Sequence, residues 1–257
     1  MKNTVDLEYD LELGEEVADI DWCQMRQTIA RIAQAEERRW TRPDGSKFWE
    51  DHPSRLPILA SYWRTVPGFT TAAAAAAAAQ QSANDTVAWS AAFICFVMAT
   101  AGVRQVHGFE FSQRHITYIV GALRNRERSD QNRVFWLADQ IEVQSEAAPE
   151  SGDLLCFNRR VDGVMTQHSY ASLRRAYWSG GNQNRVPTGS SHCSIVVGKV
   201  ERNGEWFIQT IGGNESAAGS GVRGVTVGLR EIPIDRFGGI PDPQARNIFG
   251  IIKLIGC

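Results

Sequence analysis

The sequence lacks several patterns that would place it in a large functional class. It has no run of eighteen apolar residues, so no membrane-spanning helix is predicted. The H-E-x-x-H and H-x-E spacings of zinc hydrolases are absent, as is the G-x-x-x-x-G-K-[ST] phosphate loop. We therefore expect neither a metal nor a cofactor. The net charge of −2 argues against nucleic acid as a partner, because phosphate binding requires a basic face.

Cysteine is also scarce, with five residues and no C-x-x-C pair among 257. This pattern indicates a reduced protein made in the cytoplasm. Residues 1–16 are acidic and lack the apolar segment of a secretory signal, so no such signal is expected. We expect residues 1–19 to be loosely ordered and residues 20–257 to form one domain.

The first half of the chain shows helical patterns. Hydrophobic spacing predicts helices over 20–40 and 113–127, and the eight alanines at 72–79 favour another helix. A further helix is expected to run through Val97 to Ala101, with Asp85 and Thr86 as its cap.

After about residue 134 the pattern changes to short β-rich runs. Strands are predicted at 153–157, 193–200, 206–211, 224–229 and 248–254, with a hairpin turn at 201–205. The stretch 158–191 is polar and has no clear period, which predicts a long loop. Helices followed by a meandering antiparallel sheet indicate an α+β fold.

Two motifs favour nucleophilic catalysis. Ser90 lies in W-S-A-A-F at a predicted helix start, where the helix dipole and free backbone N–H groups stabilise a developing oxyanion. Taken alone, this motif is more readily explained by a small residue that packs a helix start. His192 lies at the entry to a β-rich run, and a histidine on such a rigid support suits a general base.

A third motif, I-G-G-N, ends the strand that is expected to pair with the His192 strand. Counting back from the hairpin places Asn214 near the level of His192, where its amide would fix the imidazole tautomer. The same residues are also typical of a plain turn. His115 starts a helix and either lines a substrate cleft or is an ordinary polar residue. Cys193 and Cys95 are expected in the core.

Five motifs occur in a fixed order, namely W-S-A-A-F-I-x-F-V-M-x-x-A-G-V, F-S-x-x-H-x-x-Y-I, G-D-L-L-C-F, S-H-C-x-I-V-V and I-G-G-N. Their order resembles a family of bacterial domains of unknown function that is similar to the NlpC-type and CHAP-type cell-wall peptidases. The resemblance covers about residues 20–255. It implies a papain-like fold, with N-terminal helices packed on a central antiparallel sheet.

The resemblance also implies roles for individual residues. Ser90 takes the nucleophile position, His192 the base and Asn214 the third polar position, while Gly152 and Asp153 begin the first core strand. Trp89, His115 and Tyr118 are the expected substrate contacts. The peptidases have cysteine where this chain has Ser90. Three explanations remain open: a native serine, an engineered inactive form, or a fold that kept binding and lost catalysis.

These residues predict a hydrolase that cleaves amide bonds of peptidoglycan peptides. Such an enzyme would be exported by a dedicated secretion system, as an antibacterial effector with an export or immunity partner. The alternatives are an esterase or acyltransferase of the papain-like group, and a non-catalytic module that binds cell wall or protein.

Overall fold

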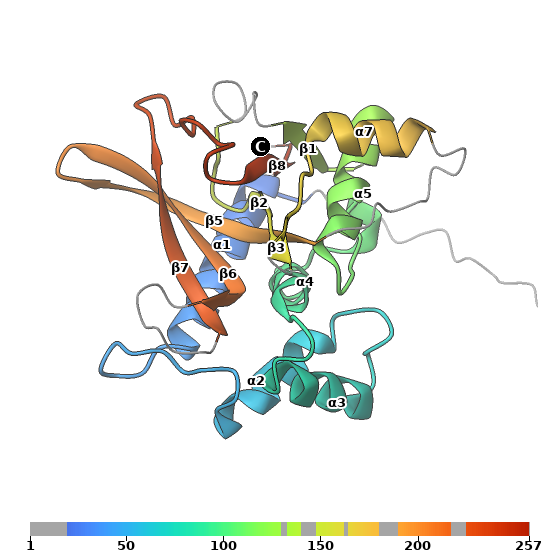
Figure 1. Cartoon of the computed structure of the whole chain (residues 1–257), viewed down its shortest axis with the longest axis vertical. Coiled ribbons are helices and arrows are strands. Elements are labelled where there is room, and N and C mark those ends of the chain that lie inside the picture. Colours follow the sequence, from blue (N-terminus) through green and yellow to red (C-terminus); the bar gives the residue numbers. More distant parts are fainter. Residues whose placement is uncertain are drawn as a thin grey trace, which may run out of the picture.

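The computed structural model describes residues 20–129, 133–139, 148–161, 164–179, 190–216 and 225–256. Within these residues the chain forms an α+β fold of helices and one large antiparallel sheet (Figure 1). The α-helices are α1 (Trp22–Arg39), α2 (Leu56–Trp63), α3 (Ala72–Ala83), α4 (Ser90–Thr100), α5 (His115–Glu127) and α7 (Tyr170–Ser179). The α+β prediction is confirmed.

The large sheet has six strands in the order β1-β8-β2-β5-β6-β7, and each neighbouring pair is antiparallel. A two-stranded ribbon, β3 (Arg160–Val161) with β4 (Val164–Met165), lies beside it. The strands of the sheet are β1 (Phe135–Asp139), β2 (Leu154–Asn158), β5 (Ser191–Arg202), β6 (Glu205–Ser216), β7 (Val225–Ile234) and β8 (Ile248–Leu254).

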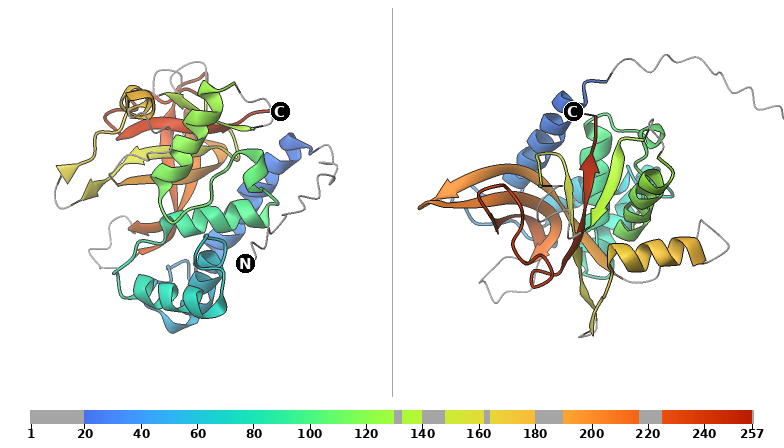
Figure 2. Two further views of the ribbon diagram at one scale, coloured as in Figure 1. Left: turned by 90° about the vertical axis from the view of Figure 1, so that its right-hand side faces the viewer. Right: turned by 90° about the horizontal axis from the view of Figure 1, so that it is seen from above.

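The two faces of the sheet are covered differently. Alternate residues of β2 show this, because Leu154 and Cys156 belong to the main core with the helices, whereas Leu155 and Phe157 belong to a smaller second core. Helices α1, α4 and α5 pack on the first face. The segment between β7 and β8 runs on the side of the sheet away from α5 (Figure 2), and its Ile240 belongs to the second core.

The β5–β6 hairpin fixes the register of the central strands. Its turn residues Asn203 and Gly204 both have positive φ, at 54° and 83°, which suits the right-handed twist of the flanking strands. Arg202 and Glu205 close the turn as a strand pair, as the sequence predicts.

Three sequence expectations were wrong. Helix α4 begins at Ser90, and its N-cap is Trp89 rather than Asp85 or Thr86, since the preceding residues are used to end α3. Strand β1 was missed. The predicted loop at 158–191 contains α7, whose short pattern of two buried side chains, Leu173 and Tyr177, carries little periodic signal.

The expectation of a fully reduced protein was also wrong, because Cys23 is disulfide-bonded. Spacing along a chain does not reveal which cysteines meet in space. Cys95, Cys156 and Cys193 are free and buried, as predicted. The predicted loosely ordered segment 1–19 lies outside the described residues. In the described part of the chain, no helix is long and apolar enough to cross a membrane.

Candidate active site

Ser90 is the first residue of α4, which packs against β5 and β6. Its position is set by Trp89, whose indole is fully buried and stacks on Trp40 at a centroid distance of 5.0 Å. The Trp89 indole N–H donates to Glu50 at 2.8 Å. The helix start is therefore held by a buried polar contact and by aromatic packing, rather than by a side-chain cap.

The hydroxyl of Ser90 is hydrogen-bonded to His115 Nε2 at 2.6 Å. His115 Nδ1 is in turn hydrogen-bonded to the hydroxyl of Tyr118, one turn along α5. All three side chains are buried. The sequence predicted His192 as the partner of Ser90; the structure places His115 in this position instead.

His115 is held in its neutral form. Burial, followed by the positive charges of His192 and Arg159, keeps the pKa of His115 well below its usual value. A neutral imidazole has one acceptor nitrogen. The Ser90 hydroxyl can therefore donate to Nε2 while Nδ1–H donates to Tyr118.

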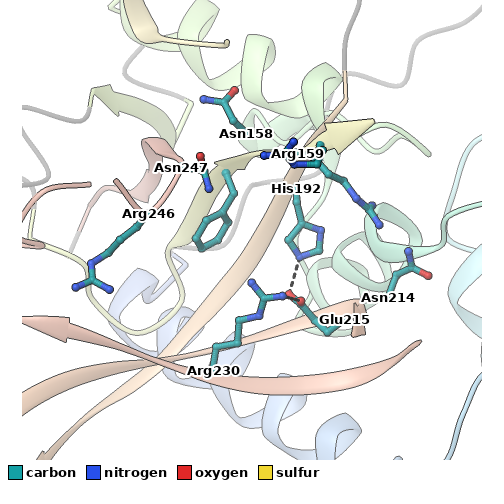
Figure 3. A pocket seen from close by; sticks show the side chains of 10 residues that line it. Asn158, Arg159, His192, Asn214, Glu215, Arg230, Arg246 and Asn247 are labelled. Atoms are coloured by element: carbon teal, nitrogen blue, oxygen red, sulfur yellow. Dashed lines mark hydrogen bonds and ion pairs between the residues drawn. The ribbon is translucent and has the colours of Figure 1, made fainter. Parts of the chain in front are cut away.

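His192 has a carboxylate partner. His192 Nε2 lies 2.7 Å from Oε1 of Glu215, and Ser194 Oγ lies 3.2 Å from the same oxygen. The other oxygen of Glu215 forms an ion pair with Arg230 (Figure 3). Burial acts to raise the pKa of Glu215, but the hydrogen bond and charge of His192, with Arg230, hold that pKa below its usual value.

The sequence predicted Asn214, not Glu215, as the partner of His192. The register between β6 and β7 shifts between Gly212 and Glu215, and Asn214 has a φ of 57°. A bulge of this kind interrupts the alternation of side chains along a strand. Glu215 therefore points toward His192, whereas Asn214 lies at the edge of the neighbouring cavity.

Two glycines of β6 lie where a side chain would clash, one with the carboxylate of Glu215 and the other with the start of α4. A Cβ at Gly212 would lie 2.6 Å from Glu215 Oε1 and 2.7 Å from Ser194 Oγ. A Cβ at Gly213 would lie 2.7 Å from both Phe93 and Trp89. No side chain fits at either position, so Gly212 and Gly213 set the spacing between α4 and the His192 cluster.

The two histidines are neighbours. The rings of His115 and His192 meet edge to face, with centroids 5.1 Å apart. The structure thus joins two pairs, Ser90 with His115 and His192 with Glu215, into one cluster. The described residues contain no group of histidine, cysteine and acidic side chains that could hold a metal.

Two cavities open on the histidines of this cluster. One, of about 230 Å³, is lined by Ser90, His115 and Arg159. The other, of about 220 Å³, is lined by His192, Glu215 and Arg159 among others (Figure 3). We expected Trp89 and Tyr118 to contact substrate, but both are buried and neither lines these two cavities.

The cysteines near the site are unsuited to nucleophilic attack. Cys193 and Cys156 face each other in the core, with their sulfurs 3.2 Å apart. Burial raises the pKa of Cys95 to about 12, so its thiol stays protonated. Ser90 is thus the better candidate nucleophile among these side chains.

Sequence reasoning missed two contacts of the candidate site, Ser90 with His115 and His192 with Glu215. The H-x-x-Y spacing of His115 and Tyr118 puts both side chains on one face of a helix, which was a usable signal. Glu215 adjoins the predicted Asn214, but only the bulge decides which of the two meets His192.

Residues 58–251 match a bacterial family described as "Uncharacterized protein conserved in bacteria (DUF2272)". The chain belongs to this family. No curated protein and no solved structure matches the chain.

Proposed function

We propose that this DUF2272 member is a papain-like hydrolase that cleaves amide bonds in peptidoglycan peptides, with Ser90 as its nucleophile. The observation that carries the proposal is the 2.6 Å hydrogen bond between Ser90 Oγ, at the first residue of α4, and His115 Nε2. A nucleophile at a helix start, in contact with a neutral imidazole and next to a second histidine with a carboxylate partner, is an arrangement suited to acyl transfer.

The two histidines divide the proton transfers. Ser90 Oγ attacks the amide carbon and its proton passes to His115 Nε2, so His115 takes the role of base that we expected for His192 from the sequence. The leaving amine takes a proton from His192, whose imidazolium form Glu215 stabilises. Water then attacks the acyl-enzyme and gives a proton to His192, while Ser90 regains its own from His115. Each group returns to its starting state.

The polar character of the cavity beside His192 favours a peptide substrate over a lipid. Its lining includes the amides Asn158, Asn214 and Asn247. The disulfide at Cys23 agrees with action in an oxidising compartment outside the cytoplasm, where peptidoglycan lies. An exported antibacterial effector, with an export or immunity partner, is part of this proposal.

A second candidate function rests on a larger neighbouring cavity. About 720 Å³ in volume, it is lined by Phe157, Leu229 and Ile232 together with charged side chains, and it shares Glu215 and Arg230 with the cavity beside His192. Its apolar side chains can receive an acyl chain. An esterase or acyltransferase that uses Ser90 is therefore the alternative.

Incubation of purified sacculi with the protein, read out by mass spectrometry of released muropeptides, tests the proposal. Ser90→Ala should abolish cleavage, whereas Ser61→Ala should not, since Ser61 lies on α2 and donates to Ile58 O. Parallel assays on simple esters separate the two candidates. Activity on esters alone would favour the esterase, and no activity on either class would leave a non-catalytic binding module.

His115→Gln and His192→Gln separate the roles of the two histidines. If His115 is the base, its loss should slow acyl-enzyme formation for ester and amide alike. Loss of His192 should slow amide cleavage more than ester cleavage, because an amine leaving group needs a proton and an activated alkoxide needs it less. Equal effects of both variants on both substrates would contradict this division.

A further inference from the structure

The cavity beside His192 is strongly basic. Four arginines line it, three of them labelled in Figure 3, and Glu215 is the only acidic residue among the described residues of its lining. The arginines are Arg159, Arg160, Arg230 and Arg246. The whole chain has a net charge of −2, so this concentration of positive charge is local to the site.

Arg159 occupies a special position in this cavity. It lines both the cavity beside His192 and the one that contains Ser90. Its backbone is fixed by Thr166, whose hydroxyl accepts from Arg159 N–H at 2.9 Å and whose N–H donates to Arg159 O at 3.1 Å. The backbone is thus held by two hydrogen bonds, and the side chain is half-buried.

Within the described parts of the chain, the guanidinium of Arg159 has no hydrogen-bond or ion-pair partner, and neither has that of Arg246. Arg230, by contrast, is paired with Glu215, although half of its side chain remains exposed. A half-buried guanidinium without a partner beside a reactive group is typical of a site that receives an anion.

We propose that Arg159 binds a carboxylate of the substrate next to the bond that is cleaved, so that the site selects anionic peptides. The bond cleavage in this statement rests on the proposed function, whereas the binding of the carboxylate does not. A planar guanidinium suits a carboxylate because two parallel N–H groups meet its two oxygens.

The test uses the stem tetrapeptide of peptidoglycan in two forms, the free acid and the peptide with every carboxyl group amidated. Calorimetry on Ser90→Ala measures binding without cleavage. We expect the free acid to bind at least tenfold more tightly than the amidated form. Adding Arg159→Met should remove most of this preference, because it weakens the binding of the free acid and leaves that of the amidated peptide unchanged. Arg159→Lys should restore part of the preference.

Arg64→Met is the matched control, because Arg64 is an exposed arginine at the end of α2, outside both cavities. It should leave both affinities unchanged. Equal binding of the two peptide forms, or no effect of Arg159→Met, would overturn the proposal. Tighter binding of inorganic phosphate than of the free acid would also overturn it, in favour of a phosphorylated ligand.

Kinetics on the wild-type protein keep the two proposals apart. If the free acid binds but is not cleaved, the hydrolase fails and the carboxylate site stands. If both peptide forms are cleaved with the same KM, the hydrolase stands and the carboxylate site fails. Support for both requires Arg159→Met to raise KM for the free acid about tenfold or more, with little change in kcat.

Discussion

Glu215 takes the place beside His192 that regular strand alternation assigns to Asn214. Asn214 has a φ of 57°, a conformation that asparagine adopts more readily than most residues. At the residue scale, the backbone preference of one side chain thus brings the carboxylate of its neighbour to the imidazole. The two residues have different roles, and substitutions can separate them.

Glu215→Gln should lower kcat by at least about 100-fold, because the amide accepts the same hydrogen bond but cannot stabilise a charged His192. The pKa of Glu215 is held below its usual value, so this carboxyl is ionised throughout pH 5–9. Any pH dependence of activity in that range should then report the histidines. Steady-state kinetics across this pH range provide the measurement, and an unchanged kcat would remove Glu215 from the mechanism.

Asn214→Gly should retain most activity, because glycine adopts positive φ freely and preserves the bulge. Asn214→Ala should lower the free energy of unfolding by about 1 kcal/mol through backbone strain. Urea denaturation and kinetics on both variants distinguish a backbone role from the catalytic role expected from sequence. Loss of activity in the stable glycine variant would restore Asn214 as a direct partner in catalysis.

At the scale of elements, the start of α4 depends on a buried acid. Glu50 is 5% exposed, accepts from Trp89 and donates its backbone N–H to Val225 O on β7. Burial raises the pKa of Glu50 to about 7, and Asp85 and Asp51 add to this rise. The carboxyl is therefore protonated in the folded state at pH values where it is ionised in the unfolded chain.

The raised pKa of Glu50 makes the stability of the fold fall as the pH increases. Between pH 4.5 and about 7 the folded state binds more protons than the unfolded state at this group. The contribution of Glu50 to stability is full below pH 4.5 and is lost as the pH rises through about 7. Ionisation of Glu50 thus destabilises the fold at neutral and alkaline pH.

Glu50→Gln should remove this loss, because glutamine still accepts from the Trp89 indole and carries no charge. We expect the variant to exceed the wild type in stability by about 1 to 3 kcal/mol at pH 8 and to match it at pH 4.5. Thermal unfolding at both pH values measures this. Glu201→Gln, at an exposed position on β5, should leave the pH dependence as it is. The same result for both variants would exclude a special role for Glu50.

At the scale of the whole molecule, Asp153 links the first helix to two strands of the sheet. Its fully buried carboxylate accepts from Arg26 on α1 and Lys253 on β8, both at 2.7 Å. It also accepts from the backbone N–H of Glu150 at 2.9 Å and from that of Leu254 at 3.1 Å.

Asp153→Asn should therefore destabilise the fold by about 3 to 5 kcal/mol, because Arg26 and Lys253 lose their buried partner and keep only the exposed carboxylate of Glu150. Turnover per folded molecule should not change. Glu231→Gln breaks the exposed ion pair with Arg202 and should cost at most about 1 kcal/mol. Denaturation curves measure both costs, and a stable but inactive Asp153→Asn variant would contradict the structural role.

The sequence by itself determined the main elements of the fold. Helical spacing predicted α1 and α5, alternating β-rich runs predicted β5 to β8, and Asn203-Gly204 marked the hairpin. These signals are local, since each arises from residues within one or two turns of one another. Ser90 at a helix start and His192 at a strand start were identified for the same reason.

Only the tertiary structure decided which side chains meet. The partner of Ser90 is His115, 25 residues away on another helix, and the partner of His192 depends on a bulge that no residue pattern records. The arginines around the cavity come from β3, β7 and the segments that follow β2 and precede β8, so their common position is invisible in the sequence. Contacts between distant segments depend on packing and register, and these are properties of the whole fold rather than of any local run of residues.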